Sequence, residues 1–184
     1  MTQHGDVATA FIGLGANVGR RLAHLRFAVR RLDAHPAIRV AGTSPVYETE
    51  AHTLDPAETQ PPYLNAVVRV ETELPPEALL DACLQIERAA GREREAARRW
   101  APRPLDLDLL VYEGCTRETP RLTLPHPRLA ARRFVLRPWA DLAPNLYVPS
   151  PFDATVQELL ARCPDAAPVR RTPHELAPPP SAPT

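Results

Sequence analysis

The chain has 184 residues, of which 22 are acidic and 22 are basic, so its formal net charge is zero. This length is typical of one domain, and the neutral balance excludes an overall field that would attract nucleic acid or a membrane surface. Every basic residue is an arginine, which excludes a Walker lysine and a Schiff-base lysine. Two segments, 88–103 and 121–137, are locally basic, and they indicate either a localised anionic ligand or solvated helix faces.

Three cysteines, Cys83, Cys115 and Cys163, lie far apart in the sequence and form no C-x-x-C motif. This usage is typical of reduced, structural thiols in a cytosolic protein. The N-terminus lacks the basic and then apolar segments of a signal peptide, and the longest apolar runs are too short to span a bilayer. We therefore expect a cytoplasmic protein that has no membrane partner.

The apolar patterns predict alternating strands and helices in the first part of the chain. Strands are expected where apolar residues cluster or alternate, and helices where they recur every three or four residues. In chain order we predict a strand at 9–15, a helix at 20–34, a strand at 38–49, a strand at 65–73, a helix at 75–91 and a strand at 105–114. Pro45 marks an edge or a bulge in the second strand. This β-α-β-β-α-β order is the α+β, ferredoxin-like arrangement.

Helical and irregular additions are expected after this core. A short helix is predicted at 134–142, and Asp153 is predicted to cap another helix that runs to Cys163. The segment 164–184 is rich in proline and nearly devoid of apolar residues, which predicts a disordered tail without a catalytic role. We therefore expect a single domain over 9–163, followed by the tail at 164–184.

The last predicted strand carries two aspartates, Asp106 and Asp108, that alternate with leucines. Side chains two residues apart on a strand share a face, so both carboxylates point one way and the leucines point into the core. Neighbouring carboxylates repel unless a cation lies between them, and Mg²⁺ characteristically binds one or two carboxylates together with substrate phosphates. The alternative is a solvated strand face paired with arginine. Arg103 and the other arginines upstream favour the metal site, because guanidinium groups bind phosphate oxygens.

The glycines of GLGANVG, at positions 13, 15 and 19, are a weak signal for a dinucleotide-binding loop. Their spacing is one residue too long for G-x-G-x-x-G, and Val18 occupies the place of the third small residue. We expect this segment to form a tight turn between the first strand and the first helix.

Four other side chains have two interpretations each. Tyr63 and Asn65 share a strand face, where a ring and a carboxamide can stack on a heterocycle and bind its amide-like edge. By themselves, they favour a core tyrosine and a strand-end asparagine. His126 lies between two prolines in a rigid segment, and a lone histidine is most often a polar surface group. Trp100 could cover an adenine or anchor its loop.

The segment RWAPRPLDLDLL, at 99–110, closely resembles the signature of the 6-hydroxymethyl-7,8-dihydropterin pyrophosphokinase family. That signature is a basic residue, a spacer, Gly or Ala, Pro, Arg, two residues and then Asp-hydrophobic-Asp, and it fits without a gap. The resemblance extends over 9–160, through FIGLGANVG, SPVYETE, PPYLNAVV, IERAAGRER and LTLPHPRLAARRFVLRPWADLAP. The family's ferredoxin-like fold agrees with the element order predicted above.

The resemblance implies a reaction of folate biosynthesis. The hydroxymethyl oxygen of the pterin attacks the β-phosphorus of ATP, the pyrophosphoryl group is transferred and AMP leaves. Asp106 and Asp108 match the pair that holds two Mg²⁺ ions, which neutralise the charge that develops at the leaving oxygen. Arg92 and Arg103 match catalytic arginines that bind the phosphates from a mobile loop.

The resemblance also implies the remaining substrate contacts. Besides Arg92 and Arg103, the residues expected to contact ATP are Trp100, Arg121, Thr123, His126 and Arg132. The residues expected to contact the pterin are Thr49, Tyr63, Asn65 and Phe134, and Ile86 and Glu87 match residues near both substrates. The chain departs from the family pattern at Glu50 and Ala51, which replace the prolines that usually follow the threonine.

Two other classes of protein remain open from the sequence. One is a different nucleotide-dependent transferase, because strand-borne Asp-x-Asp pairs also serve nucleotidyltransferases and sugar transferases. The other is a module that binds single-stranded RNA through aromatic residues on a sheet face, although the strands lack that aromatic pattern. We expect ATP and the pterin as the partners of this chain, and no nucleic acid.

Overall fold

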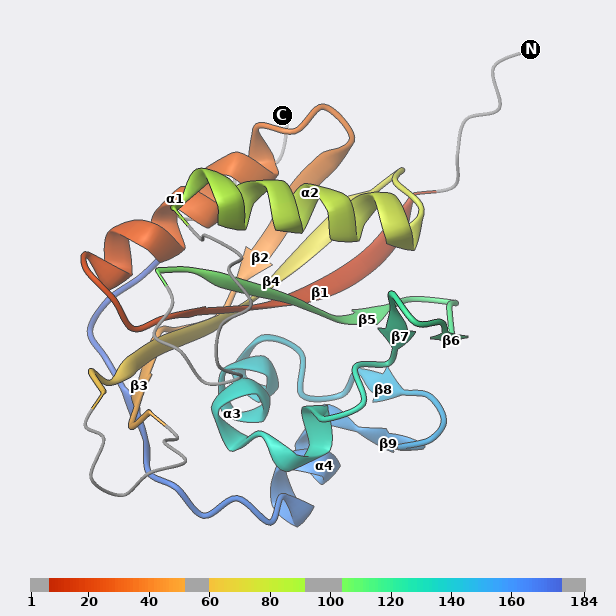
Figure 1. Cartoon of the computed structure of the whole chain (residues 1–184). Helices are drawn as coiled ribbons and strands as arrows, with labels where there is room; N and C mark the ends of the chain where they lie inside the picture. The colour runs from red at the N-terminus through yellow and green to blue at the C-terminus, as the bar shows by residue number, and fades with distance from the viewer. Residues whose placement is uncertain (1–6, 52–59, 92–103, 177–184) are drawn as a thin grey trace, which may run out of the picture.

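The structure, a computed structural model, describes residues 7–51, 60–91 and 104–176. Within these residues, six strands form one antiparallel sheet with helices on both faces (Figure 1). The strands of this sheet are β1 (Ala8–Ala16), β2 (Ile38–Thr43), β3 (Tyr47–Thr49), β4 (Tyr63–Thr72), β5 (Asp106–Tyr112) and β10 (Val169–Arg171). The helices are α1 (Arg21–Asp33), α2 (Pro76–Ala89), α3 (Arg133–Leu142) and α4 (Val156–Arg162), and a 3-10 turn, η1 (Leu129–Ala131), precedes α3. Short pairs of strands form two hairpins, β6 (Arg117–Glu118) with β7 (Thr123–Leu124) and β8 (Tyr147–Val148) with β9 (Ala154–Thr155).

The order of strands across the sheet is β10-β3-β4-β1-β5, and β2 also pairs with β4. The register places Asn65 of β4 opposite Gly15 of β1, and Gly15 opposite Asp106 of β5. These three residues therefore form a row across the sheet. Because neighbouring strands lie about 4.8 Å apart, the backbones of Asn65 and Asp106 are separated by roughly 10 Å.

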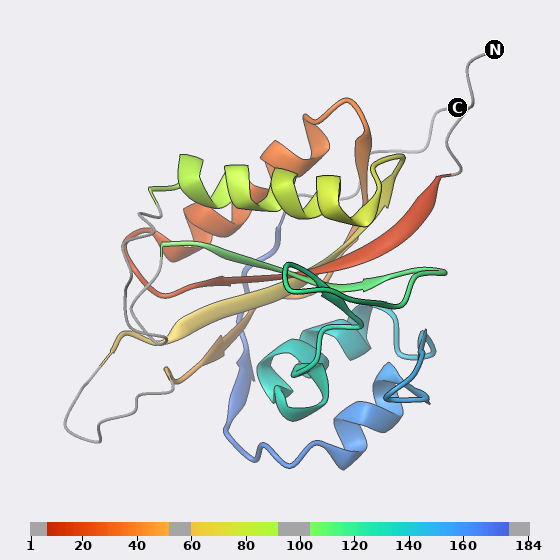
Figure 2. The same ribbon diagram turned by 45° about the vertical axis from the view of Figure 1, so that its right-hand side comes forward.

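The two faces of the sheet pack against different pairs of helices. Helices α1 and α2 cover one face, and α3 lies against the other face with α4 packed on it (Figure 2). On β5, the predicted orientation of the leucines is confirmed, since Leu105, Leu107 and Leu109 are buried in the core beneath α1 and α2. Removing each such side chain from water contributes about 2 kcal/mol to folding. The two aspartates consequently point to the α3 face.

The predicted helices of the core are confirmed to within two residues at each end. Helix α2 has Pro76 in its first turn, where its missing N–H costs no hydrogen bond, and ends just before Gly91, whose φ is +88°. Helix α1 ends at Asp33, three residues before Pro36, which cannot continue a helix. The predicted helix at 134–142 corresponds to α3.

The single strand predicted at 38–49 is two strands in the structure. β2 and β3 both pair with β4, but residues 44–46 between them are not part of either strand. The register against β4 shifts by one residue between β2 and β3, and it also shifts within β2 after Val40. Ser44 still pairs with β4, since its N–H donates to the Val67 carbonyl at 2.8 Å and its hydroxyl accepts from the Val67 N–H at 2.8 Å. Pro45 has no N–H to continue the ladder, which explains why the break follows Ser44.

The predicted cap of the last helix is wrong. Helix α4 is capped by Thr155, whose hydroxyl accepts from the Glu158 N–H at 3.3 Å, while the Glu158 carboxylate accepts from the Thr155 N–H at 2.8 Å. This is a reciprocal capping box. Asp153 has a positive φ of 46° in the turn before it and binds the Tyr147 hydroxyl instead.

The tail is not disordered over its first part, contrary to the prediction. Residues 169–171 form β10, which pairs with β3 at the edge of the sheet, and Leu176 is only 4% exposed. Composition misses this because backbone hydrogen bonds, which need no apolar pattern, hold the segment. Ordered structure therefore extends beyond the domain boundary predicted at Cys163, whereas residues 177–184 lie outside the described residues.

The three cysteines are unpaired, as predicted. Burial raises the pKa of the Cys83 thiol to about 12, which makes it a structural rather than a reactive group. None of the helices in the described ranges is long and apolar enough to cross a membrane.

Candidate functional site

Two glycines of β1 form the floor of the candidate site. Gly13 and Gly15 lie within β1, in agreement with the strand predicted at 9–15, and the turn expected between this strand and the first helix falls at Gly19, whose φ is +66°. A Cβ atom at Gly15 would lie 3.3 Å from Oδ1 of Asn65, and one at Gly13 would contact Leu110 at 3.5 Å. Gly15 therefore keeps the space beside the Asn65 amide free of a side chain, whereas the Leu110 side chain lies against Gly13.

The two aspartates of β5 border this floor on one side. Asp106 and Asp108 pair across the strands with Gly15 and Gly13, so both carboxylates lie next to a position without a side chain. Nη1 of Arg132 donates to Oδ2 of Asp108 at 3.2 Å, and 34% of the Asp108 side chain remains exposed. Asp108 is thus held by Arg132, and part of its side chain remains accessible to a ligand.

A buried acid fixes the backbone between the two aspartates. Glu87, near the end of α2, is 1% exposed, and its Oε1 accepts from the N–H of Leu107 at 2.8 Å. Because Leu107 lies between Asp106 and Asp108, this bond sets the position of the strand that carries both carboxylates. The sequence resemblance placed Glu87 near the substrates, and the structure gives it this contact with β5.

A pocket of about 320 Å³ opens beside the aspartates. It is bordered by β5, α2 and the segment that contains β7. Its polar lining consists of Glu87, Asp106, Asp108, Thr119, Arg121, Thr123 and His126. The structure therefore brings three of the residues predicted to bind ATP into one pocket with the carboxylate pair. Arg121 also forms an ion pair with Asp81 of α2, which holds this side of the pocket together.

His126 is a neutral histidine at physiological pH. Burial, followed by the nearby charges of Arg132 and Arg128, lowers its pKa to about 4, and Asp106 opposes this only in part. The backbone N–H of Arg128 donates to Nδ1 of His126 at 3.2 Å, so the proton of the neutral ring is on Nε2. The backbone N–H of His126 donates to the Leu110 carbonyl at 2.8 Å, which attaches the segment to β5.

Arg132 connects the carboxylates to an aromatic ring. Its guanidinium carbon lies 5.8 Å from the centre of the Phe134 ring at the start of α3, a cation–π distance. The same guanidinium binds Asp108, so one side chain touches both the predicted metal pair and the predicted pterin contact. Phe134 is thereby held on the face of the sheet that carries the site.

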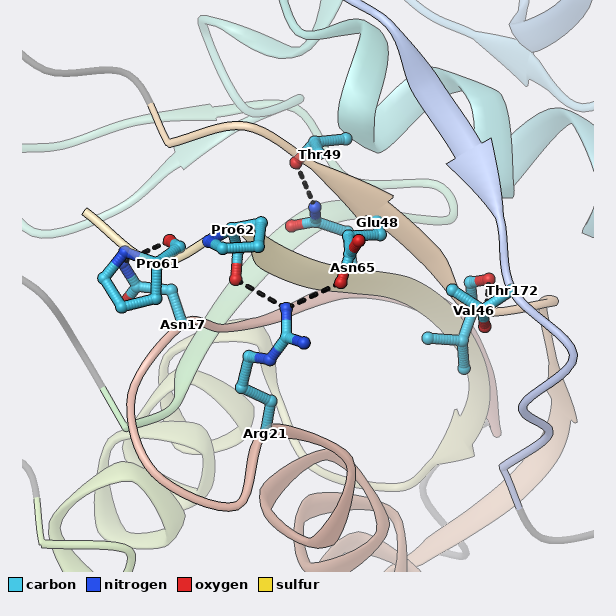
Figure 3. A network of polar contacts seen from close by, with 9 residues as sticks. All are labelled: Asn17, Arg21, Val46, Glu48, Thr49, Pro61, Pro62, Asn65 and Thr172. Atoms are coloured by element: carbon cyan, nitrogen blue, oxygen red, sulfur yellow. Dashed lines mark hydrogen bonds and ion pairs between the residues drawn. The ribbon is translucent and has the colours of Figure 1, made fainter. Parts of the chain in front are cut away.

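The other side of the floor is a buried amide. Nδ2 of Asn65 donates to Oγ1 of Thr49 at 2.8 Å, and the two residues are 5% and 7% exposed (Figure 3). Tyr63, two residues before Asn65, lies on the same face, with its ring atom Cδ1 3.8 Å from a Cβ built at Gly15. The structure thus brings three of the predicted pterin contacts together, and the sequence could not show that Thr49 orients Asn65.

Sequence reasoning missed a second group of contacts next to this amide. Nη1 of Arg21, in the first turn of α1, donates to Oε2 of Glu48 at 2.9 Å and to the Pro62 carbonyl at 2.7 Å (Figure 3). Nδ2 of Asn17 donates to the Pro61 carbonyl at 3.4 Å. These bonds hold the residues that precede Thr49 and Tyr63. Nothing in the local sequence indicates them, because they depend on how β3 and β4 pair.

Three predicted residues cannot be placed. Arg92, Trp100 and Arg103 lie outside the described residues, as do Arg94, Arg98 and Arg99. In the described part of the chain, no cluster of three or more His, Cys, Asp or Glu side chains could hold a metal ion. Asp106 and Asp108 supply two carboxylates on one strand face, and hard oxygen ligands of this kind suit a cation such as Mg²⁺.

Comparison with known proteins gives one consistent family. Residues 11–144 match the model of the 7,8-dihydro-6-hydroxymethylpterin-pyrophosphokinase family. A 2-amino-4-hydroxy-6-hydroxymethyldihydropteridine pyrophosphokinase of Methylorubrum extorquens is 46% identical over 154 residues, which are 83% of this chain and 92% of the relative. The protein of the same name from Pseudomonas aeruginosa is 39% identical over 158 residues, 86% of this chain and 93% of the relative.

The fold resembles that of solved structures that bear the family's name. The crystal structure of wild-type Plasmodium falciparum HPPK-DHPS with STZ-DHP aligns with a TM-score of 0.65 at 13% identity. The alignment covers 88% of this chain and 44% of that longer chain. At this identity, the likeness supports the arrangement of helices and sheet.

Proposed function

Because this chain belongs to the 7,8-dihydro-6-hydroxymethylpterin-pyrophosphokinase family, we propose that it transfers pyrophosphate from ATP to the hydroxymethyl group of the pterin. The observation that carries this proposal is the row Asn65–Gly15–Asp106, in which a position without a side chain separates an amide from a carboxylate. A heterocycle that binds the amide would project its hydroxymethyl group across Gly15 towards phosphates held at the carboxylates. We also propose that the core is ferredoxin-like, since β5-β1-β4-β2 with α1 and α2 on one face is that topology.

The carboxylate pair fits Mg²⁺. Asp106 and Asp108 supply hard oxygen ligands on one strand face, and we propose that they hold two ions together with the phosphates of ATP. Bound there, the metal would neutralise charge on the phosphates and on the leaving oxygen. The contribution of the chain is rigid placement, because the Glu87–Leu107 hydrogen bond fixes the backbone between the two ligands.

We propose that the phosphates and the nucleotide occupy the pocket beside β5. Nε2–H of the neutral His126 is a donor that can bind phosphate oxygens there, and Arg121 and Thr123 line the outer wall. Arg132, which pairs with Asp108 at the border of the pocket, is a further proposed phosphate contact. Arg92, Trp100 and Arg103 remain predicted contacts from outside the described residues. A neutral His126 can donate a hydrogen bond to a phosphate oxygen without adding a positive charge beside Arg132. The affinity of the pocket for phosphate should therefore not depend on protonation of His126 near pH 7.

We propose that the pterin binds between Tyr63 and Phe134, with Asn65 at its amide-like edge. Thr49 contributes to pterin binding by orienting Asn65. Its hydroxyl accepts one hydrogen of the Asn65 amide, and Oδ1 and the second N–H of the amide remain available to the ligand. In the reaction, the hydroxymethyl oxygen forms a bond to the β-phosphorus and the bond from that phosphorus to the bridging oxygen of AMP breaks. The hydroxyl proton is released, and AMP leaves with the bridging oxygen.

Product analysis tests the reaction. With ATP, Mg²⁺ and 6-hydroxymethyl-7,8-dihydropterin, AMP should appear in a one-to-one ratio with the pyrophosphorylated pterin. Release of free pyrophosphate would instead indicate attack on the α-phosphorus, and ADP would indicate transfer of a single phosphoryl group. Either product would overturn the proposal. The cytoplasmic location remains a prediction, to be checked by fractionating cells that express the full chain.

A further inference from the structure

The C-terminal segment covers the outer edge of β3. Strand β10 pairs antiparallel with β3, with Val169 opposite Thr49, Arg170 opposite Glu48 and Arg171 opposite Tyr47. The pairing continues at Thr172, whose N–H and hydroxyl both donate to the Val46 carbonyl at 2.9 Å (Figure 3). The strand that carries Thr49 is therefore internal to the sheet only because of β10.

The segment is also attached beyond β10. Nε and Nη2 of Arg26, on α1, donate to the Glu175 carbonyl at 3.3 Å and 3.1 Å. Leu176 is buried in the core beneath α1 and α2. The described part of the chain thus runs from α4 along β3 to Leu176 in the layer of α1 and α2 (Figures 1 and 2). These contacts on the C-terminal side of β10 hold the segment beside β3.

Strand β3 has only three residues, and each of its side chains has a defined contact. The Tyr47 hydroxyl binds Asp141 of α3, the Glu48 carboxylate binds Arg21, and the Thr49 hydroxyl binds Asn65. So short a strand has few backbone hydrogen bonds to β4, and without β10 its outer N–H and C=O groups would face water. Its position therefore depends on contacts on both edges.

We propose that β10 is a positioning element for the pterin, because it holds β3 where Thr49 fixes the amide of Asn65. The inference rests on the proposed binding of the pterin at Asn65. An amide can present either its oxygen or its nitrogen to a ligand, and the bond from Nδ2 to Thr49 selects one orientation. A displacement of β3 by about 1 Å would release that bond and weaken recognition of the heterocycle.

Loss of the β10–β3 contacts should affect binding of the pterin and not binding of ATP. In the order β10-β3-β4-β1-β5, four strand spacings separate β10 from the aspartates, or roughly 19 Å. Loosening β10 should therefore weaken pterin binding and leave the KM for ATP unchanged. A general loss of stability would instead affect both substrates.

A matched pair of proline variants tests the inference. In an antiparallel ladder, the backbone N–H groups of successive residues point alternately towards the partner strand and away from it. The N–H of Thr172 points towards β3, because it donates to the Val46 carbonyl. The N–H of Arg170, opposite Glu48, therefore also points towards β3, and the N–H of Arg171 points away from it. Arg170→Pro removes an inward N–H, whereas Arg171→Pro removes an outward one, and both lose one arginine. An edge strand tolerates proline only at outward positions.

The measurements are the Kd for 6-hydroxymethylpterin, from its fluorescence with a non-hydrolysable ATP analogue present, and the KM for ATP. We expect Arg170→Pro to raise the pterin Kd about tenfold or more and Arg171→Pro to change it less than about twofold. Thr172→Val should raise the Kd by a few-fold, and Thr172→Ser, which keeps the hydroxyl, should restore it. The Thr172 variants decide the test if Arg170→Pro does not fold.

Asn65→Ala separates the two proposals. If Asn65→Ala leaves the pterin Kd unchanged, the proposed pterin site is wrong. If Asn65→Ala raises the Kd but Arg170→Pro raises it no more than Arg171→Pro, and Thr172→Val matches Thr172→Ser, the role of β10 is wrong. A parallel rise in the KM for ATP, together with a lower Tm, would also overturn that role, because it would show general destabilisation.

Discussion

The β5 side and the β4 side of the candidate site differ in how far their polar groups are buried. On the β5 side, Asp108 is about one-third exposed and shares one guanidinium with the Phe134 ring. On the β4 side, Asn65 and Thr49 are almost fully buried and bind each other. The β5 side therefore leaves the Asp108 carboxylate accessible to a ligand, whereas the amide on the β4 side is already held by Thr49 in the absence of a ligand.

This difference follows from the chemistry of the two proposed ligands. Exposed carboxylates and arginines lose little hydration until metal and phosphate replace it, whereas a buried amide costs free energy unless its hydrogen bonds are satisfied. Phosphate recognition relies on charge, and discrimination of a heterocycle relies on fixed donors and acceptors. Changes on the β5 side should thus mainly affect rate, and changes on the β4 side should affect binding and stability together.

The largest effect is expected at the carboxylates. Asp106→Asn and Asp108→Asn should each reduce kcat by about 1,000-fold or more, because each removes an anionic ligand of the proposed metal. The Tm should change little. The measurement is the rate of AMP formation at saturating ATP, pterin and Mg²⁺. Glu71→Gln, which removes a carboxylate paired with Arg39 elsewhere on the sheet, serves as the control. A near-normal rate in either aspartate variant would refute the metal assignment.

The next effect concerns the pH dependence of stability. The pKa of His126 is lowered to about 4, so between about pH 6.5 and pH 4 the unfolded chain binds a proton that the folded chain does not. The free energy of unfolding should therefore fall by up to about 3 kcal/mol as the pH drops through that range, and it should gain nothing from this group above it. Urea unfolding at pH 7.5 and pH 4.5 measures the difference.

Two variants check that the pH effect belongs to this ring. His126→Asn should flatten the dependence, and His174→Gln, at an exposed histidine, should leave it as it is in the unmodified chain. If both variants keep the full slope, other groups produce it, and His126 is not held neutral by its surroundings.

A smaller effect is expected at Glu87, which is the buried exception on the β5 side. Glu87→Gln keeps an oxygen that can accept from the Leu107 N–H, whereas Glu87→Ala leaves that N–H unpaired in the core. Unfolding in urea should show the alanine variant to be less stable than the glutamine variant by about 1–3 kcal/mol. Equal stabilities would mean that the hydrogen bond does not hold β5.

The smallest effect is expected from Thr49. Thr49→Val keeps the shape of the side chain and removes the acceptor of the Asn65 amide, so the KM for the pterin should rise about tenfold with the KM for ATP unchanged. Thr49→Ser should recover most of the loss. Should the two KM values rise together, the contrast between the two sides of the site would not hold.

The sequence predicted the parts of the site that depend on local periodicity. Asp106 and Asp108 were predicted to share a face because a strand repeats every two residues, and the buried leucines confirm that orientation. The helices around them followed from apolar spacing and from Pro76 and Gly91 at the ends of α2. The β5 side of the site could therefore be predicted from the sequence alone.

The contacts on the β4 side of the site could not be predicted from the sequence. The bond between Thr49 and Asn65 depends on the register of β3 against β4, and the bonds from Arg21 depend on where α1 begins relative to both strands. β10 was missed for a similar reason, since its partner β3 is more than a hundred residues away and the contact is mainly backbone. No pattern within a single segment encodes such a pairing.

The glycine floor has a consequence for resistance to inhibitors. A compound that spans both proposed substrate positions would cross β1 over the backbone of Gly15, which is flanked by the side chains of Asn65 and Tyr63. A substitution there could exclude the compound only by placing a Cβ atom 3.3 Å from Oδ1 of Asn65. The same atom would disturb the amide that we propose binds the pterin. A mutation at Gly15 that excludes such a compound should therefore also weaken binding of the substrate.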